Sequence, residues 1–190
     1  QGCDNLDPTF TKSGSNADWQ GLRLIVCTCI KAFGAQPRCT QSTNRQIGVS
    51  IMKMTTEEAF VKVLQMHGIE HAFGIIGSAF MPISDIFPDA GITFWDVAHE
   101  TNGGLIADGY TRATGKMSMV IAQNGPGITG LVTPIKTAYW NHTPLLLVTP
   151  QAANKTMGQG GFQEVEQMNL FKDMVCYQEE VRDPSRMAEV

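Results

Sequence analysis

The sequence predicts an α/β domain in which a parallel sheet is covered by helices on both faces, preceded by an irregular N-terminal extension. Two patterns lead to this prediction. From Thr55 onward, apolar strand segments alternate with segments of helical periodicity. The strand segments are almost continuously apolar, which is typical of parallel sheets buried on both sides. The length of 190 residues is enough for one domain with a small addition.

The first predicted helix begins at the capping box Thr55-Thr56-Glu57-Glu58 and ends at Gly68. Its apolar face consists of residues at helical spacing: Phe60, Val63, Leu64 and His67. The same patterns predict strands at 71–76, 92–98, 117–123 and 145–149, and helices at 81–87, 102–114, 128–140 and 164–172. A turn at Gly77-Ser78 and a long loop at 150–161 connect them, and the sequence ends at Val190 within a polar helical stretch that has no clear final element.

Two compositions meet at Met52. All ten methionines lie at or after this position, whereas four of the five cysteines lie before it. Residues 1–51 carry five Lys/Arg against three Asp/Glu, and residues 52–190 carry nine against fifteen. We therefore expect residues 1–51 to be an unassigned extension that is not native to the domain. Residues 52–190 are expected to form the domain itself, truncated at its C-terminal end.

Charge and hydropathy exclude several classes of function. The net charge of −4 offers no attraction for nucleic acid or for an anionic membrane surface. The apolar stretch Leu22–Ile30 is too short to span a bilayer, contains Arg23, and lacks the basic front of a signal peptide. Cys27 and Cys29 do not have the spacing that zinc sites prefer, so no metal site is predicted. The lone Cys176 of the acidic part is typical of a reduced, cytoplasmic domain.

The segment His99–Lys116, HETNGGLIADGYTRATGK, places one carboxylate, that of Glu100, between an apolar strand and a Gly-rich helix. An acid at such a strand end points into the crevice where open α/β sheets bind ligands. Apolar neighbours would let this carboxyl hold a proton near neutral pH. The alternative is an acid at a helix N-terminus, favoured only by the macrodipole. The apolar face of the helix is expected to contain Leu105, Ile106, Ala107, Tyr110 and Ala113.

Two Gly-rich segments are further candidates for a site. Asn124–Gly130 leaves a strand and opens a helix, which suits either a phosphate cradle or a tight turn shaped for close backbone approach. Pro126 removes one amide that a phosphate would need. Gly158–Glu164 is either a mobile loop that closes over a small ligand or a flexible connection capped by its last residues. A hydrolase is not indicated, because Ser78 lacks the flanking glycines of a nucleophile elbow.

These motifs together resemble the N-terminal, pyrimidine-binding domain of thiamine-diphosphate enzymes. The resemblance extends from about Met52 to the end, and residues 1–51 resemble no known family. It is carried by the His-Glu pair, the following Ala-Asp-Gly-Tyr-x-Arg-Ala-Thr-Gly-Lys, the Gly-Pro-Gly turn and a late Phe-Gln-Glu. Three longer stretches are similar to acetyltransferases of this family that act on a sulfonated aldehyde: Phe73–Asp85, Ala138–Thr156 and Gly158–Met168.

The resemblance implies a role for each matching residue. The glutamate corresponding to Glu100 is catalytic and hydrogen-bonds a ring nitrogen of the cofactor's aminopyrimidine. Pro126 and Gly127 would pack against that ring, and Gln163 would contact the cofactor and face the reacting centre. The substrate pocket would be formed by a turn and the same glutamine: Gly77, Ser78 and Gln163. The implied cofactors are thiamine diphosphate and Mg²⁺.

The resemblance also implies that this chain supplies only half of each active site. The family binds Mg²⁺ through a Gly-Asp-Gly segment and a pair of asparagines in a second domain. Asp108-Gly109 is not preceded by glycine and no Asn-Asn pair occurs, so the metal ligands are expected elsewhere. Sites in the family form between subunits, which implies a homodimer or homotetramer. The expected function is acetyl transfer in sulfonate metabolism. The alternatives are an acetolactate synthase-like or 2-oxo-acid decarboxylase activity, or a non-catalytic fragment that only associates.

Overall fold

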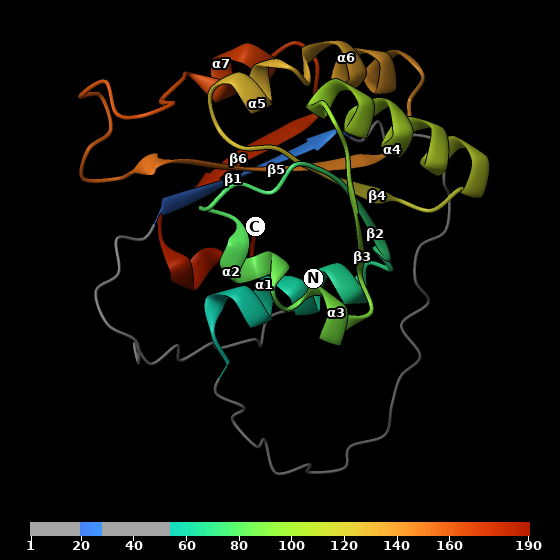
Figure 1. The fold of residues 1–190 in the computed structure, drawn as a ribbon, viewed down its shortest axis with the longest axis horizontal. Coiled ribbons are helices and arrows are strands. Elements are labelled where there is room, and N and C mark those ends of the chain that lie inside the picture. The colour runs from blue at the N-terminus through green and yellow to red at the C-terminus, as the bar shows by residue number, and fades with distance from the viewer. Residues whose placement is uncertain (1–19, 28–53) are drawn as a thin grey trace, which may run out of the picture.

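The computed structural model describes residues 54–190 in full and the backbone of residues 20–27. The expected change in amino-acid composition at Met52 and the spacing of Cys27 and Cys29 concern side chains outside the described residues. The strands form one sheet in the order β3-β2-β4-β5-β1-β6 (Figure 1). Their bounds are β1 Gln20–Cys27, β2 His71–Gly74, β3 Thr93–Asp96, β4 Ser118–Ile121, β5 Leu145–Ala153 and β6 Tyr177–Val181.

Four neighbouring strands, β3, β2, β4 and β5, are parallel, which confirms the predicted sheet. β1 runs antiparallel to both β5 and β6. The extension therefore contains a regular strand, where the sequence led us to expect irregular structure. The free edge of β5 explains it, since Leu24 of β1 pairs with Val148 and the edge's backbone groups gain hydrogen-bond partners.

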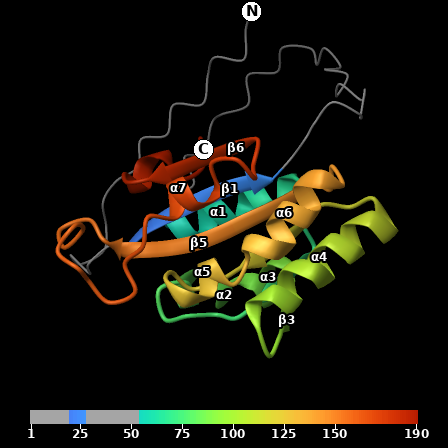
Figure 2. The same cartoon turned by 90° about the horizontal axis from the view of Figure 1, so that it is seen from above.

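Helices cover both faces of the sheet, as predicted (Figures 1 and 2). One layer contains α1 Thr56–Met66, α2 Met81–Ser84 and α3 Phe87–Ala90. The other contains α4 Glu100–Thr114, α5 Pro126–Thr129, α6 Val132–Trp140 and α7 Gln167–Phe171, with α4 lying against α6. A 3₁₀ turn, η1 Pro184–Arg186, follows β6.

The two helical layers bury alternate side chains of the same strands. In β4, Met119 and Ile121 pack into the core under α1 to α3, and Val120 packs into the core under α4 to α7. In β5, Leu146 belongs to the first core and Leu147 to the second. This alternation is the two-residue period of a strand, and it explains why the buried strands are apolar at most positions.

The capping box of α1 is confirmed. Thr55 N donates to Glu58 Oε2 at 2.7 Å, and Glu58 N donates to Thr55 Oγ1 at 3.2 Å. The inner face of α1 is confirmed at Phe60 and Leu64. Ala59 and Val61 are also buried, whereas Val63 is only partly buried and His67 is exposed at the C-cap. Gly68 follows in a left-handed conformation, with φ of 69°.

The predicted inner face of α4 is confirmed at Ala107, with Tyr110 partly buried, and is wrong for Leu105, Ile106 and Ala113, which are exposed. Its buried residues are Gly103, Gly104, Ala107, Asp108 and Thr111. The reason is close packing on two sides of the helix. A methyl group built on the first of these glycines would lie 3.1 Å from the Cα of Gly74 in β2. One built on the second would lie 2.6 Å from the ring of Pro134 in α6. The larger side chains Leu105 and Ile106 are therefore turned outward.

Other boundaries also shifted. The helices expected at 81–87 and 128–140 are each divided into two short elements, α2 with α3 and α5 with α6. β5 continues to Ala153 because β1 pairs along its full length, so the long loop begins later than predicted. After α7, the strand β6 and the turn η1 occur where no clear element was expected, with Val181 and Met187 buried in the core. No helix in the described part of the chain is long and apolar enough to cross a membrane.

Candidate active site

The predicted site residues follow the carboxyl ends of the parallel strands. Gly77 comes after β2, Glu100 after β3, Gly127 after β4 and Gln163 after β5. Parallel strands end at one edge of a sheet, so the topology places these four segments together. This is the edge at which open α/β sheets bind ligands.

Glu100 is the first residue of α4, and its side chain is half-buried. The preceding residue, His99, caps the helix by accepting a hydrogen bond at Nδ1 from Thr101 N at 3.2 Å. Thr101 Oγ1 donates to Gly130 O at 2.6 Å, which fastens the start of α4 to the end of α5. The side chain of Glu100 makes no hydrogen bond or ion pair within the described residues. The macrodipole of α4 also favours a carboxylate at this position, as the alternative interpretation of Glu100 requires.

The carboxylate of Glu100 lies against Gly127. A methyl group built on Gly127 would meet Glu100 Oε1 at 3.1 Å, closer than such contacts normally are. Gly127 is buried, whereas the neighbouring Pro126 is exposed. The turn therefore places a residue without a side chain against the carboxylate, directly after an exposed proline.

The turn at Gly125 is shaped for close backbone approach, as the second interpretation of this segment predicted. Gly125 has φ of 72°, and a methyl group there would lie 2.8 Å from Cβ of Gln163. Gln163 also has a left-handed backbone, with φ of 57°, which is uncommon for a residue other than glycine. Its carbonyl oxygen accepts a hydrogen bond from Asn124 Nδ2 at 2.9 Å.

Gly77 is joined to the same cluster by a residue that the sequence analysis missed, Gln123. A methyl group on Gly77 would overlap the amide of Gln123, so only glycine leaves room for it. Gln123 Nε2 donates to Asn124 Oδ1 at 2.6 Å, and Gln123 Oε1 is buried without a partner among the described residues. Ser78 is exposed on the turn and has no hydrogen bond to the other site residues. The available signal was a polar Gln-Asn pair shortly after a buried strand.

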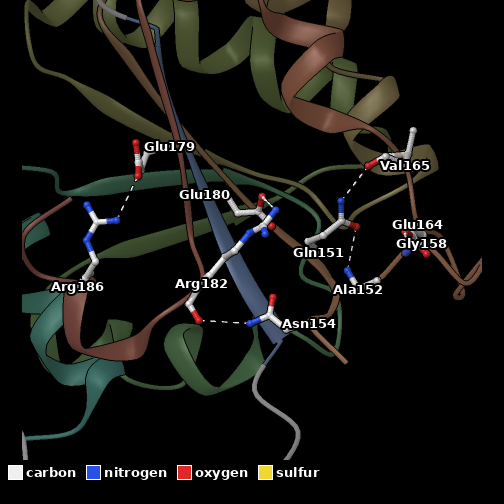
Figure 3. A network of polar contacts seen from close by, with 10 residues as sticks. All are labelled: Gln151, Ala152, Asn154, Gly158, Glu164, Val165, Glu179, Glu180, Arg182 and Arg186. Carbon is white, nitrogen blue, oxygen red and sulfur yellow. Dashed lines mark hydrogen bonds and ion pairs between the residues drawn. The ribbon is translucent and has the colours of Figure 1, made fainter. Parts of the chain in front are cut away.

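The Glu164 side chain is hydrogen-bonded to the backbone of the segment that leads to Gln163 (Figure 3). The Glu164 carboxylate accepts hydrogen bonds from Gly158 N at 2.5 Å and from Gly161 N at 3.0 Å. Gln151 Nε2 adds a hydrogen bond to Val165 O at 2.8 Å. This agrees with a connection capped by its last residues, and movement over a ligand stays a prediction.

Neither a metal centre nor a large cavity marks this site. Within residues 54–190, no group of His, Cys, Asp and Glu side chains is arranged to hold a metal ion. A groove of about 600 Å³ lies between α6 and the segment after α7, beside Lys136, Trp140 and Asp173. None of the predicted site residues line it. The chemistry of the strand ends, rather than volume, identifies the candidate site.

Parallel strands with a free carboxylate and a Gly-Pro-Gly turn at one edge of the sheet together define a class of protein. Residues 54–170 match the family described as "Thiamine pyrophosphate enzyme, N-terminal TPP binding domain". The chain belongs to this family, which confirms the resemblance of the motifs.

Individual members of the family differ widely in their sequence identity to this chain. Over 139 residues the chain is 87% identical to sulfoacetaldehyde acetyltransferase of Roseovarius nubinhibens, covering 73% of this chain and 23% of that protein. It is 80% identical to a probable sulfoacetaldehyde acetyltransferase of Rhizobium meliloti, covering 73% and 24%. Acetolactate synthase of Arthrospira platensis is more distant, at 34% identity with 74% and 25% covered. The chain thus spans about a quarter of the length of these relatives.

Solved structures agree with the fold. The thiamine diphosphate-dependent 4-hydroxybenzoylformate decarboxylase of Rhodococcus jostii RHA1 superposes with a TM-score of 0.59 and 25% sequence identity. The match covers 65% of this chain and 23% of that chain.

Proposed function

We propose that this chain is part of a thiamine-diphosphate-dependent acetyltransferase that converts sulfoacetaldehyde and phosphate to acetyl phosphate and sulfite. The observation that carries the cofactor assignment is the unpaired, half-buried carboxylate of Glu100, which lies against Gly127. The substrate assignment is supported by the identity to sulfoacetaldehyde acetyltransferases, which far exceeds that to acetolactate synthases.

The residues at the site fit the cofactor's aminopyrimidine. A carboxyl group without a protein partner is free to hydrogen-bond a ring nitrogen, which is the role proposed for Glu100. Gly127 has no side chain to obstruct a flat ring, and Pro126 offers an apolar surface beside it. Gln163 would contact the cofactor and, together with the Gly77-Ser78 turn, the substrate. When bound, thiamine diphosphate supplies the nucleophilic carbon that attacks the aldehyde.

The wider assignments follow from the same proposal. Residues 52–190 would form the pyrimidine-binding domain, and Mg²⁺ would be bound by residues outside it. The protein would act in the cytoplasm, in the metabolism of taurine and related sulfonates. These proposals rest on the family membership and on the similarity to sulfoacetaldehyde acetyltransferases.

We also propose that the active site forms between subunits of a homodimer or homotetramer. The helix that begins at Glu100, α4, carries Leu105 and Ile106 on its outward face. These residues have 43% and 47% of their surfaces exposed. Burying adjacent aliphatic side chains against a second copy would remove this surface from water. Ile106→Glu should therefore yield a smaller species by analytical ultracentrifugation. An unchanged mass would contradict the assignment of this face.

The test of the cofactor assignment compares two helix-terminal acids. Glu100→Gln in the full-length protein should leave the fold intact and largely abolish exchange of the C2 proton of bound thiamine diphosphate, measured by NMR. Glu57→Gln is the control, because Glu57 also lies in the first turn of a helix, α1. Rapid exchange in Glu100→Gln would refute the role of Glu100.

A second measurement tests the substrate. The full-length protein should release sulfite from sulfoacetaldehyde when phosphate is present. Formation of acetolactate from pyruvate, with no sulfite released from sulfoacetaldehyde, would favour the acetolactate synthase-like alternative.

A further inference from the structure

Two side-chain amides link the three loops that contain the candidate site. Gln123 lies in the space beside Gly77, and its Nε2 donates to Asn124 Oδ1 at 2.6 Å. Asn124 in turn donates from Nδ2 to the carbonyl oxygen of Gln163 at 2.9 Å. The loops after β2, β4 and β5 are thereby connected in series, the first two by a contact and the last two by a hydrogen bond. Asn124 is 4% exposed, so water competes little for these hydrogen bonds.

The last partner in this line, Gln163, needs support. Its φ of 57° is a left-handed conformation that L-residues other than glycine adopt at an energetic cost. Gly125 permits the close approach because it has no Cβ. Within the described chain, the hydrogen bond from Asn124 is the only one made by the backbone of Gln163. Its side-chain amide has no partner there and is free to meet a ligand.

We propose that Asn124 is a positioning residue that holds Gln163 in this conformation, so that the free Gln163 amide faces the Glu100–Gly127 site. The inference rests on the proposed function in one respect, the assignment of Gln163 to the reacting centre. Asn124 has the required chemistry because it is both acceptor and donor. Its oxygen is oriented by Gln123, which leaves its nitrogen directed at Gln163.

A purely structural role makes a different prediction. Any buried amide that donates to a backbone carbonyl contributes to stability, and its loss lowers the unfolding temperature. Gln178 is a matched control, because its Nε2 donates to Met168 O at 3.0 Å and it lies on β6, outside the site. A positioning role requires that Asn124→Ala change the loop around Gln163 in a way that Gln178→Ala does not.

The experiment measures amide hydrogen exchange of residues 156–166 in the full-length protein. Loss of the hydrogen bond in Asn124→Ala should accelerate exchange there by roughly fivefold to tenfold, whereas Gln178→Ala should leave it unchanged. The effect should shrink in a Gln163→Gly background, because glycine adopts the left-handed conformation without strain. Should the alanine variant fail to fold, Asn124→Asp replaces it, since aspartate keeps the acceptor for Gln123 and lacks the donor.

Kinetics provide the second arm. Asn124→Ala should lower kcat/KM for the aldehyde by about tenfold, as expected for a lost polar contact at the reacting centre. Unchanged exchange in the loop would contradict the proposal that Asn124 holds Gln163 in its conformation. Faster exchange with an unchanged kcat/KM would contradict the positioning role of Asn124 in the reaction. Failure of the proposed function is distinguished from both, since the unmodified protein would then release no sulfite while the exchange result would stand.

Discussion

Replacing Gly127 by alanine should separate cofactor binding from folding. The new methyl group would lie 3.1 Å from Glu100 Oε1, and its next neighbours, Cβ of Gln123 and of Ala122, are 3.6 and 3.7 Å away. Only the carboxylate must move, by a few tenths of an ångström, and it is the end of a flexible side chain. Displacing it costs about 0.5–1.5 kcal/mol if Glu100 leaves its rotamer. Alanine in the helical turn α5 recovers roughly 0.5–1 kcal/mol relative to glycine, so the stability should change little.

Binding should respond differently, because the methyl group would displace the Glu100 carboxylate and narrow the space proposed for the aminopyrimidine ring. Overfilling a packed site costs about 1–3 kcal/mol. At about 1.4 kcal/mol per tenfold, the Kd for thiamine diphosphate should rise roughly fivefold to a hundredfold or more. The assay is calorimetric titration of the full-length protein with thiamine diphosphate and Mg²⁺, paired with thermal denaturation.

The control is Gly109→Ala. Gly109 is exposed on α4, and a methyl group there would meet nothing within 4 Å. This variant should gain about 0.5–1 kcal/mol of helix stability and keep the same affinity. An unchanged affinity in Gly127→Ala, with the fold intact, would show that the ring does not lie against Gly127.

Further predictions concern packing, pH and metal dependence. Gly104→Ala should destabilise the fold by about 1–3 kcal/mol, because its methyl would lie 2.6 Å from the Pro134 ring; an unchanged melting temperature would contradict this. The pKa of Glu70 is lowered by a 2.8 Å hydrogen bond from Lys116 and by its charge. The stability from this pair is thus present above the usual carboxyl pKa and lost as pH falls through the lowered value. Lys116→Met should shift the NMR titration of Glu70 upward, and an unmoved curve would disprove the pairing. Isolated residues 52–190 should bind thiamine diphosphate poorly even with Mg²⁺, and tight Mg²⁺-dependent binding in calorimetry would refute the division of the site.

Local signals predicted the elements whose formation depends on near neighbours in the chain. The capping box at Thr55 formed as expected, since both of its hydrogen bonds lie within four residues. The apolar runs predicted a parallel sheet covered on both faces, because any strand buried on both sides must be apolar throughout. The Gly125 turn allows close approach, as its composition indicated.

Packing between distant segments was not predictable in the same way. The inner face of α4 was misjudged because Leu105 and Ile106 are more apolar than Gly103 and Gly104. Close approach to β2 and α6 favours the smaller residues, and no periodicity in α4 reveals that its neighbours are so near. Gln123 was missed for the same reason, since its contact with Gly77 links residues far apart in sequence.

The sequence by itself determined the class of fold, the family and the acid to examine, because these depend on residue type and short spacing. Tertiary structure decided which side chains meet. The free Glu100 carboxylate beside Gly127, the strained Gln163 and its link through Asn124 exist only because parallel strands end at one edge of the sheet. Hydrogen bonding and steric fit act over a few ångströms, so they are set by folded positions and not by distance along the chain.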